Sequence, residues 1–219
     1  MALKLISKGF EFLQRIKFKL GIDRKSFVLR HIKENQCRNI LEIGVFNGNF
    51  ALRIISTASE FIGPQAINYS GVDLFKLNFS NEIKFNEIAL TPDKKSDVQK
   101  SLESTGANIN LFEGFSDIIL PQLVGAELFD LIIIDGGHSY ETVKSDFLNS
   151  TKLLSNKGCI IFDDYTNSRG ETIGKFGINR VVREIDRSKF NVRISYNRDY
   201  FWKPYGLLIL RMVKVCPKY

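Results

Sequence analysis

The chain has 219 residues, of which 44% are hydrophobic and 25% are charged, so it can bury a full core and has the composition of an ordinary globular domain. No apolar run is long enough to span a bilayer, and the N-terminus lacks the apolar stretch of a signal peptide. Six of the seven net positive charges lie in residues 1–36, and the nearly neutral remainder argues against a nucleic-acid partner.

Residues 1–36 are predicted to form a basic, amphipathic, helical extension of a main domain that covers residues 37–219. Within residues 3–20, apolar residues recur at helical spacing and basic residues stand between them. Four interpretations remain open for this extension: it packs on the main domain, covers the functional site, rests on an anionic membrane surface, or joins copies of the chain into a homo-oligomer.

The three cysteines are Cys37, Cys159 and Cys216. Their odd number and scattered positions favour a reducing compartment. We therefore expect a cytoplasmic protein, peripheral to the inner face of a membrane if the first helix binds there. Cys159 lies in an apolar run and is expected to be a buried free thiol.

Beyond residue 37, apolar strands alternate with helical segments, which is typical of a parallel sheet covered on both faces. The last two strands have no helix between them and indicate an antiparallel hairpin at one edge. We expect an α/β, Rossmann-like, doubly wound sheet with the strand order 3-2-1-4-5-7-6. Strands are expected at residues 39–43, 69–73, 109–112, 128–135, 158–162, 190–196 and 206–214, and helices at residues 25–35, 48–59, 92–105, 116–123, 139–154 and 178–187.

The turn after the first strand carries the first ligand signal. Gly44 and Gly48 allow the backbone to approach a ligand closely at the positive end of the next helix. A dinucleotide fingerprint would need a glycine where Phe46 stands. Glu42 suits a cationic amino-acid ligand better than an anionic phosphate, so these residues favour such a ligand over a nicotinamide dinucleotide.

Further ligand contacts are expected where the second and third strands end. Asp73, followed by Leu74, can accept hydrogen bonds from both hydroxyls of a ribose. Gly114, Phe115 and Ser116 would flank an adenine ring. An acid at a strand end is often only a helix cap, and it is the order of these elements that makes the combination specific.

Acidic residues follow the fourth and fifth strands, which are neighbours in the expected sheet. The carboxylates of Asp135, Asp163 and Asp164 should converge beyond one sheet edge, where like charges need a cation or a proton. Oxygen ligands with open positions suit Mg²⁺, with Mn²⁺ or Ca²⁺ as alternatives. The other interpretation makes Asp163 or Asp164 a helix cap and Asp135 a loop carboxylate.

These motifs resemble those of class I S-adenosylmethionine-dependent methyltransferases, over about residues 37–215. The residues that carry the resemblance are Glu42, Ile43, Gly44, Gly48, Asp73 and the run 129–135. The run 135–141, with Asp146 and residues 162–165, resembles a narrower subgroup, the metal-dependent O-methyltransferases of macrolide and aminocoumarin sugars. The resemblance implies S-adenosylmethionine as cofactor, a metal at the three aspartates, and a hydroxyl group on a small molecule or glycan as methyl acceptor.

His138 lies three residues after Asp135 and is expected to be the general base that removes the acceptor proton, with Asp135 beside it in the catalytic site. The resemblance implies the same role, and the alternative is a histidine packed in a loop. Acceptor contacts are expected from two loops, residues 75–92 and 165–179. The side chains proposed there and nearby are Tyr140, Tyr165, Arg169 and Phe176, for which core packing is the alternative.

Other functions remain open. A catechol- or phenol-type O-methyltransferase is the nearest, although such enzymes carry lysine where this chain has His138. A nicotinamide-dependent oxidoreductase, and a non-catalytic or hydroxylase-like relative, are alternatives of other classes with the same fold.

Overall fold

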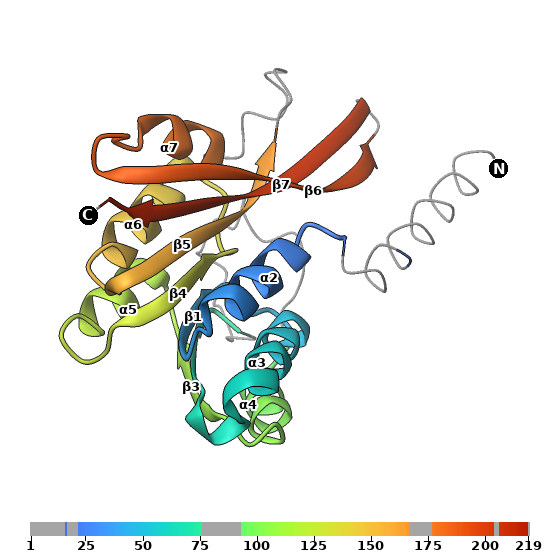
Figure 1. Ribbon diagram of the computed structural model, residues 1–219, viewed down its shortest axis with the longest axis vertical. Coiled ribbons are helices and arrows are strands. Elements are labelled where there is room, and N and C mark those ends of the chain that lie inside the picture. Colours follow the sequence, from blue (N-terminus) through green and yellow to red (C-terminus); the bar gives the residue numbers. More distant parts are fainter. Residues whose placement is uncertain (1–15, 17–21, 76–92, 167–176, 204–205, 219) are drawn as a thin grey trace, which may run out of the picture.

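Seven strands form one mixed sheet with the order β3-β2-β1-β4-β5-β7-β6 (Figure 1). The computed structural model describes residues 16, 22–75, 93–166, 177–203 and 206–218. The strands are β1 (Asn39–Ile43), β2 (Asn68–Asp73), β3 (Asn108–Glu113), β4 (Phe129–Ile134), β5 (Leu154–Thr166), β6 (Phe190–Lys203) and β7 (Gly206–Pro217). The first five strands pair in parallel, whereas β7 is antiparallel to both β5 and β6. The predicted order and the C-terminal hairpin are confirmed.

Helices cover both faces of the sheet (Figure 1). One face packs against α2 (Ser26–Asn35), α3 (Asn49–Ile62) and α4 (Lys95–Glu103), and the other against α5 (Ser116–Gln122), α6 (Tyr140–Ser150) and α7 (Ile178–Glu184). A short 3₁₀ helix, η1 (Pro64–Ala66), precedes β2. Alternate residues of β4 show why both faces are needed, since Leu131 and Ile133 join one apolar cluster while Ile132 and Ile134 join the other.

The elements differ from the predicted ones mainly in length. The strands β6 and β7 are longer than expected, because the hairpin pairs them almost from end to end. Strand β5 is also longer, because it pairs with β4 from Leu154 and with β7 as far as Thr166. Helix α6 ends at Ser150 rather than at residue 154, since the chain must turn before β5 begins. The helix expected over residues 3–20 lies outside the described residues, apart from Ile16. Among the described residues, no helix is both long and apolar enough to cross a bilayer.

Cys159 is not a free thiol. The register of β5 and β7 places Cys159 opposite Cys216, and the two residues form a disulfide with a Cα–Cα distance of 4.4 Å. The prediction for Cys159 is therefore wrong, because only the strand pairing brings together two cysteines that are 57 residues apart. Cys37 is buried and free. The cysteines no longer support the expected reducing compartment.

The buried face of α2 carries His31, which is 5% exposed and is bonded through its ring to the side chain of Asn35. Burial, together with the charge of Lys214, lowers the pKa of His31 from 6.5 to about 4. The unfolded chain takes up a proton at His31 below about pH 6.5, whereas the folded chain does so only near pH 4. Stability from this group is therefore present above pH 6.5 and is lost as the pH falls toward 4.

We expect His31 to contribute about 2 kcal/mol to the loss of unfolding free energy between pH 7.5 and pH 5. Urea unfolding at both pH values measures this loss, and His31→Gln should reduce it by that amount. Arg30→Gln is the matched control, because Arg30 is exposed on the same helix and carries no imidazole; it should leave the loss unchanged. Equal pH dependence in the wild type and His31→Gln would contradict the assignment.

Candidate functional site

The turn between β1 and α3 is held in an unusual backbone conformation. Gly44, Phe46 and Gly48 have φ values of 92°, 54° and 76°, and Phe46 is the only one of the three with a side chain. The backbone N–H of Phe46 donates to Oδ2 of Asp73 at 2.7 Å, which stabilises this left-handed conformation. Phe46 stands where the dinucleotide fingerprint has a glycine, and its hydrogen bond to Asp73 on β2 stabilises the backbone there.

Asp73 ends β2 and organises two segments at once. Its Oδ1 accepts from the backbone N–H of Phe75 at 2.9 Å, and its main-chain carbonyl accepts from Gly114 at 3.0 Å. Half-buried Leu74 follows it, and Phe115, which is 39% exposed, precedes Ser116 at the start of α5. These residues lie at the same sheet edge as the Gly44 turn, as the sequence predicts.

Glu42 lies beneath this edge and is 1% exposed. It accepts a hydrogen bond from the hydroxyl of Tyr69 on β2. Burial raises the pKa of Glu42 to about 8, although the Tyr69 bond and the nearby Lys25 lower it. Glu42 therefore holds a proton near neutral pH, and a cationic group in the neighbouring cavity would favour its ionisation.

A cavity of about 220 Å³ opens above Glu42. Its wall contains residues 44–47, Glu42, Asn49, Phe50, Arg53, Asp135 and Lys25. The cavity joins the glycine turn to the end of β4. It therefore combines acidic and basic groups that can bind the two charges of an amino-acid moiety.

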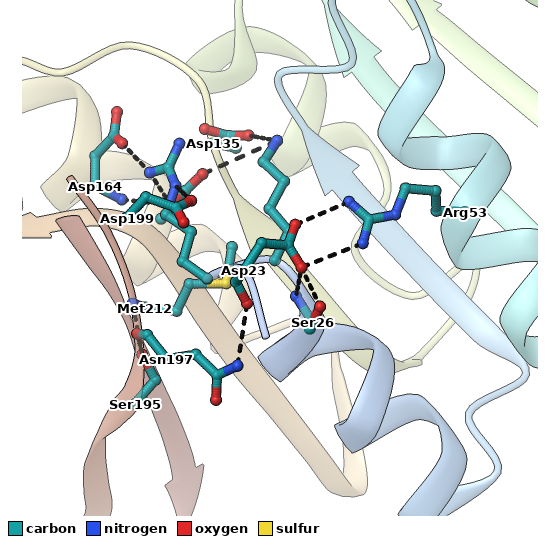
Figure 2. A network of polar contacts seen from close by, with 12 residues as sticks. Asp23, Ser26, Arg53, Asp135, Asp164, Ser195, Asn197, Asp199 and Met212 are labelled. Atoms are coloured by element: carbon teal, nitrogen blue, oxygen red, sulfur yellow. Dashed lines mark hydrogen bonds and ion pairs between the residues drawn. The ribbon is translucent and has the colours of Figure 1, made fainter. Parts of the chain in front are cut away.

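The three aspartates at the ends of β4 and β5 do converge, but around cations of the same chain (Figure 2). The Arg24 guanidinium donates through Nη1 to Asp163 at 2.5 Å and to Asp164. Nε of Arg24 lies 3.3 Å from Oδ2 of Asp199 on β6. Lys25 Nζ donates to Oδ2 of Asp135 at 2.9 Å.

Asp163 is the most buried member of this group, with 2% exposure. Burial raises its pKa well above the ordinary value; Arg24 opposes this effect, while Asp135 and Asp164 add to it. Asp164 follows with φ of 59°, a left-handed conformation that its backbone N–H stabilises by donating to Oδ1 of Asp163 at 2.7 Å. The aspartate pair is thus both electrostatically and conformationally strained.

His138 lies on the far side of the same acids. Its Nδ1 is 3.8 Å from Oδ2 of Asp164, and its carbonyl accepts from the backbone N–H of Gly177 at 2.7 Å. A small cavity of about 10 Å³ lies between His138, Asp135, Asp163 and Asp164, with room for one hydroxyl-sized group. Asp135 lines both this cavity and the larger one. The site thus joins a ligand cavity to a histidine that can accept a proton.

A family model described as a methyltransferase domain matches residues 41–165, which is more than half of the chain. The chain belongs to this methyltransferase family. The matched segment contains the glycine turn, Asp73, His138 and the three aspartates. It leaves out Arg24 and Lys25, which precede it.

Solved structures agree with the fold of this methyltransferase. The O-methyltransferase TomG from Streptomyces achromogenes, involved in tomaymycin synthesis and bound to S-adenosylmethionine, has a TM-score of 0.61 at 15% identity, over 89% of this chain and 79% of that chain. An O-methyltransferase from Bacillus cereus in complex with S-adenosylhomocysteine has a TM-score of 0.61 at 15% identity, over 95% of this chain and 90% of that chain. Both have the class I methyltransferase fold.

One curated relative shares a shorter segment. An uncharacterised protein of Acanthamoeba polyphaga mimivirus is 34% identical over 62 residues, which are 28% of this chain and 28% of that protein. Because this match spans little more than a quarter of either chain, it gives no information on activity beyond the methyltransferase family.

The metal predicted for this methyltransferase does not fit the three aspartates in this arrangement. One carboxylate oxygen of each of Asp135, Asp163 and Asp164 is already bonded to Arg24 or Lys25. Within the described residues, no group of three acidic, histidine or cysteine side chains is arranged to hold a metal. A divalent cation would have to displace both basic side chains. We therefore derive no catalytic step through a metal.

Sequence patterns did not reveal Arg24, Lys25 or Asp199 as site residues. The sequence assigns Arg24 and Lys25 only to the basic extension, and Asp199 lies in a strand expected to end at residue 196. The hydrogen bonds from Arg24 and Lys25 to Asp135, Asp163 and Asp164 span 110 to 140 residues of chain, so no local spacing signals them. In the sequence, only the two adjacent basic residues before α2 indicated that positive charge could reach the aspartates.

The proposed acceptor residues are only partly described. The hydroxyl of Tyr140 donates to Glu184 at 2.6 Å and accepts from Lys144 at 2.7 Å, while Arg180 lies 3.8 Å from its ring centroid. These contacts between α6 and α7 favour the packing alternative for Tyr140. Tyr165 is half-buried against the apolar cluster of the same face. Arg169, Phe176 and most of the two predicted acceptor loops lie outside the described residues.

Proposed function

We propose that the protein transfers the methyl group of S-adenosylmethionine to a hydroxyl oxygen of a small molecule, most simply a sugar or glycoconjugate. The observation that carries this proposal is the pair of adjoining cavities that share Asp135, one beneath the glycine turn and one beside His138. The methyltransferase family match and the S-adenosylmethionine bound in TomG support the cofactor. The sugar class rests on the Asp135-x-x-His138 resemblance.

In this proposal each cofactor moiety has its own partner. Asp73 accepts from the ribose hydroxyls, and Phe115 covers the adenine at the end of β3. The amino-acid moiety occupies the cavity above Glu42, whose ionisation its ammonium group would favour. This arrangement directs the sulfonium methyl group toward Asp135 and the cavity beside His138.

The chemical step is an in-line displacement. His138 removes the proton of the acceptor hydroxyl, and the oxygen forms a bond to the methyl carbon as the carbon–sulfur bond breaks. The sulfonium becomes a neutral thioether, S-adenosylhomocysteine. Alignment of oxygen, carbon and sulfur supplies most of the acceleration, because the protein needs to perform little other chemistry.

The first test is calorimetric titration with S-adenosylhomocysteine, with NAD as the competing ligand. We expect the protein to bind S-adenosylhomocysteine and not NAD. Asp73→Asn should weaken this binding about 100-fold, because it removes a charged acceptor of two hydrogen bonds. Asp97→Asn, an exposed acid in the first turn of α4, is the matched control and should bind as the wild type does.

Binding of NAD instead of S-adenosylhomocysteine would overturn the methyltransferase proposal in favour of the oxidoreductase alternative. Equal affinities of Asp73→Asn and the wild type would remove Asp73 from the ribose site. A cytoplasmic location, and membrane contact through residues 3–20, remain predictions that cell fractionation of the full chain can test.

A further inference from the structure

Two basic side chains of the same chain lie among the carboxylates of the active site. Four carboxylates, those of Asp135, Asp163, Asp164 and Asp199, lie around the side chains of Arg24 and Lys25. Lys25 Nζ is also 4.0 Å from Oδ2 of Asp163, so Asp163 lies close to both Arg24 and Lys25. Such a group of acids at one sheet edge would repel without positive charge, and the two basic residues supply it.

A separate set of contacts holds this basic pair in place (Figure 2). Asp23 accepts from Nη1 of Arg53 on α3 at 3.1 Å, and its carbonyl accepts from the side chain of Asn197 on β6 at 3.1 Å. Asp23 also accepts from the backbone N–H and the hydroxyl of Ser26. The segment before α2 is therefore fixed on two sides by bonds that do not involve the three aspartates.

Lys25 also belongs to the ligand cavity. Its ammonium group is 4.3 Å from the ring centroid of Phe50 and lines the cavity with Glu42 and Asp135. Burial by itself lowers the pKa of Lys25, but the nearby Asp135 and Asp163 outweigh it and leave the pKa above its ordinary value. Lys25 thus remains a cation on the wall of this cavity.

We propose that Arg24 and Lys25 occupy the place of a divalent cation in this active site, so that the protein works with a metal site permanently filled by its own side chains. Lys25 keeps a positive charge beside Asp135, on the wall of the cavity proposed for the amino-acid moiety, and Arg24 pairs with both Asp163 and Asp164. In the step described above the proton passes to His138, and Lys25 keeps its own protons throughout. This assignment rests on the proposed function, but its first consequence concerns metal binding and can be measured without an acceptor.

The experiment is a Mn²⁺ titration of the full chain, followed by the electron paramagnetic resonance signal of the free ion. We expect the wild type to show no site tighter than about 1 mM, the range of weak carboxylate sites. Arg24→Gln/Lys25→Gln should bind Mn²⁺ at least ten-fold more tightly, because the four carboxylates lose their counter-ions. Lys33→Gln is the matched control, since Lys33 lies on α2, which follows the basic pair, and pairs with Glu60 at the surface; it should behave as the wild type does.

Lys25→Gln alone keeps the Arg24 contacts and provides the measurement if the double variant does not fold; it should bind Mn²⁺ at least three-fold more tightly than the wild type. Tight Mn²⁺ binding by the wild type would overturn the proposal, because the basic pair would then yield to the metal. Absence of a gain in the folded variants would also overturn it, since the acids would then form no cation site. The titration with S-adenosylhomocysteine is independent of these outcomes, so a failure of the proposed function can be told apart from a failure of this inference.

Discussion

Replacing Gly44 by alanine is expected to destabilise the protein by about 4 kcal/mol and to abolish cofactor binding. A Cβ atom at Gly44 would lie 2.2 Å from the carbonyl oxygen of Asp135 and 2.8 Å from Cα of Gly136. Both contacts are with backbone, which cannot rotate away. Asp135 N–H is bonded to the carbonyl of Ile43 at 2.8 Å, so the two strand ends are tied together at this point.

The left-handed conformation adds to the effect, because φ of Gly44 is +92°. Urea unfolding measures the stability change, and titration with S-adenosylhomocysteine measures the loss of binding. Gly125→Ala is the matched control. Gly125 has a φ of +87°, but its Cβ would meet nothing within 4 Å, so only the backbone cost of about 1 kcal/mol remains. If Gly44→Ala and Gly125→Ala were equally stable, the close contact of residue 44 with the backbone after β4 would contribute nothing to the loss of stability.

Replacing His138 by alanine is expected to lower turnover by about 10²- to 10⁴-fold, the usual contribution of a general base. The affinity for S-adenosylhomocysteine should stay within about two-fold of the wild type, because His138 lines the small cavity and is absent from the wall of the larger one. Transfer of a labelled methyl group to the acceptor identified by screening measures turnover. His31→Gln is the control, since His31 is buried on α2 and should retain turnover in the folded protein.

Unchanged turnover in His138→Ala would exclude the base assignment. Loss of S-adenosylhomocysteine binding in the same variant would instead show that His138 supports the fold of the cofactor site. These two results separate a role in proton transfer from a role in structure.

The sequence predicted where most of the proposed cofactor-binding residues lie. Gly44, Asp73 and Asp135 each follow an apolar run, and parallel strands bring their carboxyl ends to one edge whatever the details of packing. For Phe46 the sequence showed only that a glycine was missing. The structure adds the reason why this is tolerated, since the backbone of Phe46 is bonded to Asp73 from the neighbouring strand.

The sequence predicted a metal at the three aspartates, where the structure places the side chains of Arg24 and Lys25. Converging aspartates require positive charge, and the sequence alone offered a metal as the simplest source. Arg24 and Lys25 provide that charge from a segment more than 100 residues away in the chain. The disulfide between Cys159 and Cys216 is a similar case, because only the register of β5 and β7 sets the two residues opposite each other.

The sequence by itself determined the doubly wound sheet, its strand order and the residues at the strand ends. These follow from local periodicity and from the short connections between successive elements, which nearby residues encode. Only the tertiary structure decided which charges meet at the active site. Ion pairs between distant segments depend on how α2, β5 and β6 pack together, and no pattern within any one of these segments records that packing.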